Sequence, residues 1–397
     1  MGENLSSSAR AATTTDRHGS EDLASGPGVT RLAPSPTGAL HLGNARTFLI
    51  TWAMARQRGW RIILRIEDLD TPRVKAGAMV SLIGTLAWLG MDWDPPIVGP
   101  RENPLVQSRD LEPYRAAIRS LAERGLAYPC ELTRAQIEQA ASAPQEGSHE
   151  VAFPSTLRPD FAGAPMAFDF VQRDALGGKG EGANWRFLCP SGAVEFDDRF
   201  AGPSAYNPSE SVGDFILWTK RDQPSYQLAV VVDDCRQGVN RVVRGDDLRE
   251  SAARQMLLYR ALGYEGEERG RLYAERGGTQ EGLHAERGGI QERLHAEREG
   301  TQIQIPEYWH LPLVIGADGR RLAKRHGDTR VEMYRERGVP REAIVGLIAS
   351  WSIPGVDRTP MSPDEFRARF DPATMPRIPI VFTPEDDAWL LSRSGHR

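Results

Sequence analysis

The 397-residue sequence lacks the features that would place it in several protein classes. It has three cysteines, Cys130, Cys189 and Cys235, and none belongs to a Cys-x-x-Cys pair, so a disulfide framework is excluded and reduced thiols are expected. Its longest apolar runs, such as Leu228 to Val232, are far too short to cross a bilayer. The first 28 residues also lack the hydrophobic core of a signal peptide. Composition therefore predicts a soluble, cytoplasmic protein without a membrane contact.

The sequence also lacks an excess of basic residues, since its formal net charge is −5. Proteins that coat nucleic acid without sequence preference are usually basic overall. Any contact with RNA is therefore expected to be confined to a local patch.

The N-terminal third alternates strand-like and helix-like segments. Residues 1–28 are rich in Ser, Thr, Ala and Gly, which predicts a disordered leader, unless the true start codon lies further along the chain. Apolar spacing then predicts a strand at 29–33, a helix at 43–58, a strand at 60–67 and a helix at 74–89. This order predicts an α/β fold in which helices cover a parallel sheet.

The rest of the chain is less regular. Residues 128–200 have weak periodicity and frequent Gly and Pro, which predicts an inserted subdomain. The apolar run 225–232 predicts a buried strand, and 247–262 predicts a helix. The expected division is a leader (1–28), the two halves of a nucleotide-binding fold (29–127 and 201–265), the inserted subdomain (128–200), a repeat insertion (266–305) and a basic loop with a short helical C-terminal region (306–397).

The repeat insertion contains three near-copies of an eleven-residue unit, which begin at Tyr273, His284 and His295. An eleven-residue period can support a helix, but the paired glycines at 277–278 and 288–289 oppose one. A solvated loop or frayed helix without a catalytic role is therefore expected.

A first chemical motif runs from Ala33 to Asn44, with the sequence Ala-Pro-Ser-Pro-Thr-Gly-Ala-Leu-His-Leu-Gly-Asn. A strand ends, a proline turn follows, and a helix begins near Gly43, so unpaired helix amides can bind phosphate. His41 can donate a hydrogen bond to phosphate oxygens in a transition state. The alternative is an ordinary proline turn with a surface histidine.

A second motif, Arg321-Leu-Ala-Lys-Arg325, follows a glycine-bearing turn. Lys324 on such a loop can neutralise a triphosphate. The alternative is a solvated basic face or a nucleic-acid patch.

Together, these motifs resemble those of class I aminoacyl-tRNA synthetases. The first resembles their HIGH signature and the second their KMSKS loop. The segments 65–73, 226–234 and 243–263 resemble those of the glutamyl enzymes, and the resemblance covers about two thirds of the chain. It implies a Rossmann-type catalytic domain and a ligase of the aminoacyl-tRNA synthetase type.

The resemblance also implies roles for individual residues. A dianionic amino acid needs at least one guanidinium, because arginine pairs with carboxylates in a bidentate manner. Catalytic roles are implied for His41 and Lys324. For the glutamate contacts named next, the alternatives are surface ion pairs for the charged residues and core packing for the tyrosine. The implied glutamate contacts are Arg31, Ala33, Ser35, Glu67, Tyr226 and Arg244, and the implied ATP contacts are Pro34, His41, Gly43, Asn44 and Lys324.

Only residues 325–397 follow Lys324, and this short C-terminal part resembles the glutamyl-Q tRNA(Asp) synthetase subfamily. The resemblance implies a monomer that activates L-glutamate with ATP and Mg²⁺ and transfers it to queuosine in tRNA(Asp). Three alternatives remain: a truncated glutamyl-tRNA synthetase that charges the tRNA 3′ end, a non-catalytic tRNA-binding paralogue, and another nucleotidyltransferase of this fold.

One region departs from the family pattern. In the family, a Cys-x-Cys pair and a later Tyr-Pro-x-x-Cys-Arg segment bind zinc. Here Cys130 is retained, Leu132 replaces the second cysteine, and Phe153 and Leu157 replace the later tyrosine and cysteine. A structural zinc needs four ligands, so no bound zinc is expected. His149 and Glu150 are nearby but do not complete a recognisable set. We expect Leu132, Phe153 and Leu157 to pack together instead.

Overall fold

The computed structural model describes residues 27–95, 104–140, 152–168, 183–264, 305–322 and 327–395. Several predictions fall outside these ranges: residues 1–26 of the expected leader, all but residue 305 of the repeat insertion, and Lys324.

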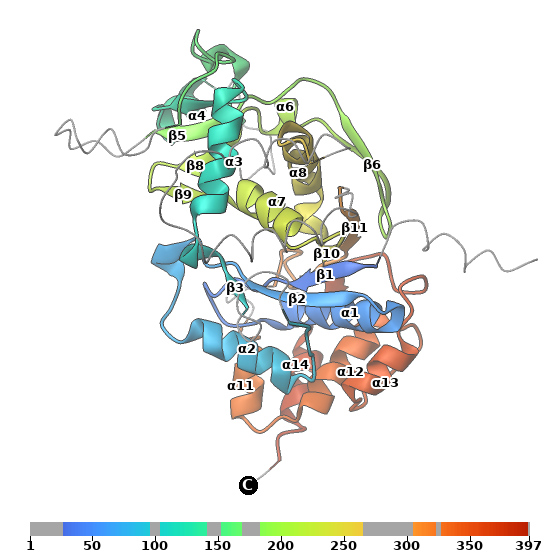
Figure 1. Cartoon of the computed structure of the whole chain (residues 1–397). Helices are drawn as coiled ribbons and strands as arrows, with labels where there is room; N and C mark the ends of the chain where they lie inside the picture. Colours follow the sequence, from blue (N-terminus) through green and yellow to red (C-terminus); the bar gives the residue numbers. More distant parts are fainter. Residues whose placement is uncertain are drawn as a thin grey trace, which may run out of the picture.

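A parallel sheet lies at the centre of the molecule (Figure 1). Its strands are β1 (Val29–Leu32), β2 (Arg61–Ile66), β3 (Leu105–Val106), β10 (Arg241–Gly245) and β11 (Glu307–Leu311). β1 pairs in parallel with β2, β2 with β3, and β10 with β11. The Asn240 N–H donates to the Val29 carbonyl over 3.0 Å and Arg31 Nη1 donates to the Val243 carbonyl over 3.4 Å, so β10 runs beside β1 in the same direction. The predicted α/β class with a parallel sheet is confirmed.

Helix α1 (Leu42–Arg58) follows β1, and α2 (Ala78–Trp88) follows β2. The C-terminus of α1 is capped by Gly59, which adopts the left-handed conformation at φ 65° that glycine accepts at low cost. Arg56 and Arg58 lie in its last turn, where positive charge interacts favourably with the helix dipole. The predicted helix at 43–58 is confirmed almost to the residue.

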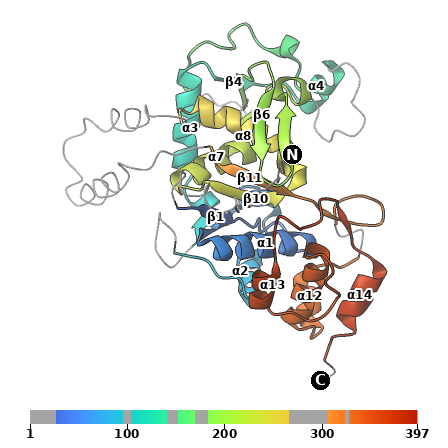
Figure 2. The ribbon, with the colours of Figure 1, turned by 90° about the vertical axis from the view of Figure 1, so that its right-hand side faces the viewer.

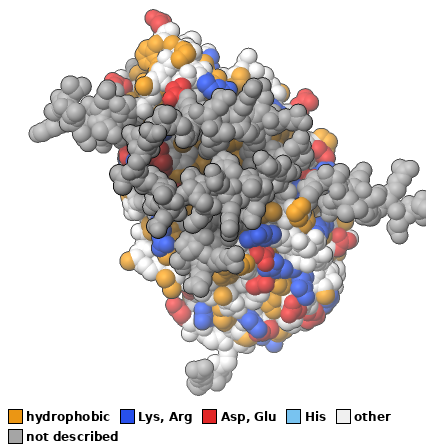
Figure 3. Space-filling model, in the orientation of Figure 1, with side chains coloured by type: hydrophobic (Ala, Val, Ile, Leu, Met, Phe, Trp, Pro, Cys, Tyr) orange, Lys and Arg blue, Asp and Glu red, His pale blue; other side chains and the backbone are white. Residues whose placement is uncertain are grey.

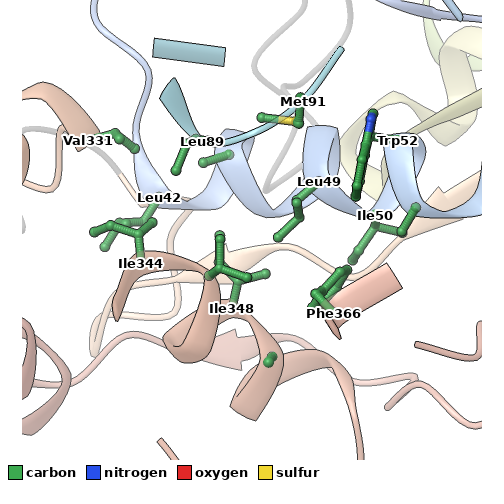
Figure 4. Close-up of a cluster of buried hydrophobic side chains, with 14 of the residues drawn as sticks. Leu42, Leu49, Ile50, Trp52, Leu89, Met91, Val331, Ile344, Ile348 and Phe366 are labelled. Atoms are coloured by element: carbon green, nitrogen blue, oxygen red, sulfur yellow. The ribbon is translucent and has the colours of Figure 1, made fainter. Parts of the chain in front are cut away.

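The C-terminal helices support α1 from below (Figure 2). They are α11 (Val331–Glu336), α12 (Arg341–Ser352), α13 (Pro363–Arg369) and α14 (Pro384–Leu391). In Figure 4, Leu49 and Ile50 of α1 lie above Ile348 and Phe366, and all four side chains are buried. Burying a side chain of this kind contributes about 1.5–3 kcal/mol. The C-terminal part thus fixes the position of α1, including its N-terminal end.

The upper part of the molecule contains an antiparallel sheet and the helices around it (Figure 1). The elements are α3 (Glu112–Glu123), β4 (Ala127–Cys130), α4 (Arg134–Ala140), β5 (Asn184–Phe187), β6 (Val194–Asp198), β7 (Gly202–Tyr206), α6 (Pro208–Ser211), β8 (Ile216–Thr219) and β9 (Gln223–Pro224). The strand order is β4-β5-β8-β9, and β6 pairs with β7 as a separate hairpin. A short parallel pair, β12 (Val314–Ile315) with β13 (Ile380–Val381), joins the chain after β11 to the C-terminal region.

The predicted strand at 225–232 is wrong, because this segment is the first part of helix α7 (Tyr226–Arg236). Ser225 caps the helix by accepting a hydrogen bond from the Leu228 N–H. Residues 227–235 are all buried, and a helix buried on every side lacks the apolar periodicity that distinguishes it from a buried strand. The helix predicted at 247–262 is confirmed as α8 (Arg249–Ala261).

Charges of both signs are interspersed where the face in Figure 3 is not covered by grey atoms. In its lower part, Lys and Arg side chains lie next to Asp and Glu side chains instead of forming a patch of one sign.

Within the described ranges, no helix is both long enough and apolar enough to cross a membrane.

Candidate active site

Four of the predicted glutamate contacts converge where the central strands end. Arg31 lies on β1, Glu67 directly follows β2, Arg244 lies on β10, and Tyr226 is the first residue of α7. The charges of Arg244, Glu67 and Arg31 all influence the pKa of Tyr226, which places the four side chains in one neighbourhood. Ligands of α/β folds commonly bind at the carboxyl ends of parallel strands.

The Tyr226 side chain combines an exposed surface with a desolvated hydroxyl. The residue is 38% exposed as a whole, yet burial raises the pKa of its hydroxyl, and Arg244 opposes that rise. Tyr226 therefore stays protonated and can donate a hydrogen bond at neutral pH.

Glu67 directs one carboxylate oxygen into the protein and leaves the other available. Its Oε1 accepts from Nε and Nη2 of Arg65 at 3.3 and 3.2 Å, whereas no bond to Oε2 is found among the described residues. Burial raises the pKa of Glu67, while Arg65 and Arg31 oppose the rise. An ammonium group at Oε2 would favour the ionised form of this carboxylate.

Arg65 holds this arrangement together and was not among the predicted site residues. Its side chain is fully buried, and its Nη1 donates to Asp234 at 2.7 Å and to Gln237 at 3.0 Å. Burial alone would lower its pKa, but Asp234 and Glu67 raise it above the ordinary value. Asp234 also lies 3.5 Å from Nε of Arg31, so the two arginines share one carboxylate. Asp234 and Gln237 are brought to this face by the helical form of α7.

Arg244 differs from these arginines because it contacts only neutral groups. Its Nε donates to Nε2 of His310 at 2.9 Å, its Nη1 to Oε1 of Gln255 at 2.9 Å, and its Nη2 to the Leu248 carbonyl at 3.1 Å. The guanidinium also lies over the Tyr308 ring, 5.1 Å from its centroid. Arg244 is only 5% exposed and has no ion pair within the described part of the chain. A buried positive charge of this kind is a suitable partner for a carboxylate ligand.

Gln255 is itself held in one orientation. Its Nε2 donates to Oε1 of Gln227 over 3.0 Å, and Nε2 of Gln227 donates to the Ser251 hydroxyl over 3.0 Å. This chain of neutral groups turns the Gln255 carbonyl oxygen toward Arg244.

His310 and Asp198 were also not among the predicted site residues, because they lie on β11 and β6, far from the motifs in the sequence. His310 is 1% exposed, and its Nδ1 lies 2.5 Å from Oδ2 of Asp198. No local pattern links these residues to Arg244. They are brought together only in the folded structure, where the pairing of β10 with β11 places His310 opposite Arg244.

The start of α1 has the features expected of a phosphate site. His41 is the N-cap, and its Nδ1 lies 2.9 Å from the Thr329 hydroxyl. The Leu42 N–H donates to the Thr329 carbonyl and the Ala45 N–H to the His41 carbonyl. In the described structure, the backbone N–H groups of Gly43 and Asn44 have no partner. A Cβ at Gly43 would lie 3.4 Å from Val314, an ordinary van der Waals contact, so the packing of α1 against β12 does not itself require glycine.

The turn between β1 and α1 places the remaining predicted contacts. Ala33 is partly buried, Pro34 is buried and Ser35 is exposed. The Pro34 carbonyl accepts from the Glu67 N–H over 3.1 Å, which ties this turn to the end of β2.

The basic loop is anchored at its start. Arg321 pairs with Asp247, and its Nη2 donates to Oδ1 of Asn44 over 3.0 Å. The loop therefore begins beside the first turn of α1. Lys324 lies outside the described residues, so its predicted role stays a prediction.

The region expected to have lost its zinc site is apolar. Cys130 belongs to a buried cluster with Tyr128, Ile137 and Phe153, against which Leu132 and Leu157 pack, as predicted. No group of three or more His, Cys, Asp or Glu side chains that could hold a metal occurs among the described residues. The described side chains around Cys130 supply a single thiol, whereas a structural zinc needs four ligands. His149 and Glu150 are not among the described residues.

Comparison with known proteins agrees with this geometry. Residues 29–283 match the family described as "tRNA synthetases class I (E and Q), catalytic domain". The chain is 38% identical to a glutamyl-Q tRNA(Asp) synthetase of Symbiobacterium thermophilum, over 91% of this chain and 97% of that protein. It is 41% identical to one of Rhodopirellula baltica, over 82% and 84% of the two chains. The resemblance predicted from the sequence is confirmed.

The fold is also similar to a solved structure. A glutamate tRNA ligase of Elizabethkingia meningosepticum, in complex with its amino acid, has a TM-score of 0.65 and 26% identity. The similarity covers 91% of this chain but 68% of that longer one.

Proposed function

This chain belongs to the class I tRNA synthetases for glutamate and glutamine, and from that premise we propose that it joins L-glutamate to ATP as glutamyl-adenylate and transfers the glutamyl group to queuosine of tRNA(Asp). It is a ligase of the aminoacyl-tRNA synthetase type, and its catalytic domain uses ATP. The target nucleoside is inferred from relatives that are about 40% identical.

The observation that carries the proposal is the buried, carboxylate-free Arg244 beside Arg31, Glu67 and Tyr226. We assign the two arginines to carboxylate groups of glutamate and Glu67 to its ammonium group. Ala33 and Ser35, in the adjoining turn, complete the amino acid site.

In the proposed reaction, a glutamate carboxylate oxygen attacks the α-phosphate of ATP and pyrophosphate leaves. A hydroxyl of the tRNA nucleoside then attacks the activated carbonyl, and AMP leaves. No protein nucleophile is needed, so the protein acts by positioning its substrates and by stabilising charge.

We assign the phosphates to the free amides at the start of α1, with His41 and Lys324 as donors to the charge that develops. Pro34, Gly43 and Asn44 complete the ATP contacts. Mg²⁺ bound with ATP would neutralise phosphate charge. We further infer a monomer that acts in the cytoplasm, where tRNA is available, and that holds no zinc.

Two relatives that the chain spans over most of their length, 97% and 84%, support the queuosine target over the tRNA 3′ end. Glutamylation should be measured with tRNA(Asp) that contains queuosine, with the same tRNA lacking queuosine, and with tRNA(Glu). We expect incorporation only into the first, and loss of incorporation when periodate cleaves the queuosine diol while the 3′ end is protected.

Charging of tRNA(Glu) that depends on its 3′ end would instead identify a truncated glutamyl-tRNA synthetase. Binding of tRNA without any activation of glutamate would identify a non-catalytic paralogue.

A further inference from the structure

The hydrogen-bonding partners of Arg244 fix the protonation state of His310. An arginine side chain can only donate hydrogen bonds, and its Nε carries a single hydrogen. Because Nε of Arg244 donates to Nε2 of His310 over 2.9 Å, Nε2 must carry the lone pair. The ring proton then lies on Nδ1, which faces Oδ2 of Asp198 over 2.5 Å.

Asp198 is fixed as an acceptor. Its Oδ1 accepts from the backbone N–H groups of Phe200 over 3.0 Å and Ala201 over 2.6 Å, at the turn between β6 and β7. Burial raises its pKa, but the bond from His310 and the backbone donors outweigh burial and lower the pKa overall. An ionised Asp198 therefore holds the Nδ1–H form of His310.

The neutral imidazole separates the negative charge from the arginine. A carboxylate in direct contact with Arg244 would orient it equally well, but it would also compete with a carboxylate ligand for the same guanidinium. Through His310, Arg244 is oriented by a neutral acceptor. Of its five N–H groups, three bind His310, Gln255 and Leu248, so Nη1 and Nη2 each keep one for a ligand.

We propose that Asp198 and His310 are positioning residues that orient Arg244 through a fixed imidazole tautomer and so determine the preference for a carboxylate-bearing amino acid over its amide. The inference rests on the proposed function, because it assigns the Arg244 ligand to glutamate.

The decisive substitution is Asp198→Asn. The asparagine oxygen would still accept from the backbone at residues 200 and 201, so its amide NH₂ would face Nδ1 of His310. The ring would then place its proton on Nε2, opposite the Nε–H of Arg244, and two donors would meet. We expect the KM for glutamate to rise about 10- to 100-fold, the cost of a buried donor without an acceptor, while kcat and the KM for ATP stay unchanged. The ratio of kcat/KM for glutamate to kcat/KM for glutamine should fall in the same variant.

A double-mutant cycle separates this mechanism from simple damage to the fold. Glutamine at position 310 can accept from Arg244 but has no tautomer to invert. Asp198→Asn should therefore cost several-fold less in the His310→Gln background than in the wild type. Asp197→Asn is the matched control, because its side chain is 66% exposed, and it should leave the KM for glutamate unchanged. An equal cost of Asp198→Asn in both backgrounds would overturn the proposal.

A spectroscopic measurement tests the arrangement independently of turnover. With ¹⁵N-labelled histidine, assigned by loss of its signal in His310→Gln, His310 of the wild type should show a protonated Nδ1 and a bare Nε2, and Asp198→Asn should reverse them. A wild-type ring protonated at Nε2 would refute the inference even if glutamate is the substrate. A wild type that activates no glutamate but shows the expected tautomer would refute the proposed function, and with it the assigned preference.

Discussion

Two arginines, Arg158 with a side chain that is 31% exposed and the buried Arg244, are held in opposite ways. Arg158, in the upper part of the molecule, makes a bidentate pair with Asp214, with both nitrogen–oxygen distances at 2.8 Å. Asp214 also accepts from the Tyr128 hydroxyl over 2.6 Å and the Cys189 N–H over 2.9 Å. Arg244, in the site, contacts only neutral acceptors. The first arginine has its charge satisfied by a carboxylate of the protein, whereas the second keeps its charge for a ligand.

Arg158 belongs to the scaffold, whereas Arg244 belongs to the site. Arg158 and Asp214 link β8 to the segment after Phe153, in the region that has only one of the expected zinc ligands. Hydrogen bonds to Asp214 and apolar packing around Cys130 hold this region together among the described residues. In the site, the scaffold pairs such as Arg65 with Asp234 surround an arginine without a carboxylate partner.

Arg46 shows that lack of a carboxylate partner is not sufficient to mark a site. Its guanidinium donates to the Ser352 hydroxyl, the Pro312 carbonyl and the Met375 sulfur, and burial lowers its pKa to about 10. All of these partners belong to the packing of α1 against the C-terminal region. What distinguishes Arg244 is that Tyr226, Glu67 and Arg31 lie beside it.

The largest expected effects come from replacing the two contrasted arginines in the same way. Arg244→Met should raise the KM for glutamate about 30- to 5,000-fold, because a buried charge pair with the ligand is worth about 2–5 kcal/mol. Arg158→Met should leave the KM unchanged and lower the free energy of unfolding by about 1–3 kcal/mol, because the buried Asp214 carboxylate loses its cation and keeps only neutral donors. Steady-state kinetics and thermal unfolding of both variants test this. The contrast fails if Arg158→Met also raises the KM for glutamate, or if Arg244→Met leaves it unchanged.

The next effects concern the phosphate end of the site, where charge develops only during the reaction. His41→Ala and Lys324→Ala should each slow ATP–pyrophosphate exchange about 10²–10³-fold without changing the KM for glutamate to the same degree. Arg320→Ala, an exposed residue of the same basic segment, is the control. A wild-type rate for either variant would remove that residue from the mechanism.

A smaller effect is expected from pH. Burial lowers the pKa of His310 to about 4, with Arg244 and Arg249 acting in the same direction and Asp198 opposing them. The unfolded chain therefore binds this proton more readily, and the free energy of unfolding should fall by about 3 kcal/mol as pH drops from about 6.5 to 4. Urea titrations across this range should show the loss in the wild type and in Arg158→Met, but less of it in His310→Gln. An equal loss in His310→Gln would contradict the assigned neutral imidazole.

The smallest expected effect is that of metal removal, which should change neither stability nor activity. Because the Cys130 region is expected to bind no zinc, chelators should leave both the Tm and the exchange rate unchanged. Elemental analysis that finds one zinc per chain would contradict this prediction.

The sequence predicts the parts of this structure whose signals are local. The helix at 43–58 and the strands beside it have clear periodicity, and the glutamate contacts lie within recognisable motifs. Helix α7 was predicted as a strand because its residues are buried on all sides, so its apolar run has no helical period. Asp198 and His310 could not be predicted, because 112 positions separate them and only the pairing of β10 with β11 and the β6 turn bring them to Arg244.

The most direct test of the account is ATP–pyrophosphate exchange by the purified protein, without tRNA, with each of the standard amino acids. We expect exchange with glutamate and far less with glutamine, because Arg244 offers an unpaired positive charge to a carboxylate. No exchange with glutamate, together with no binding of a stable glutamyl-AMP analogue, would contradict the central claim.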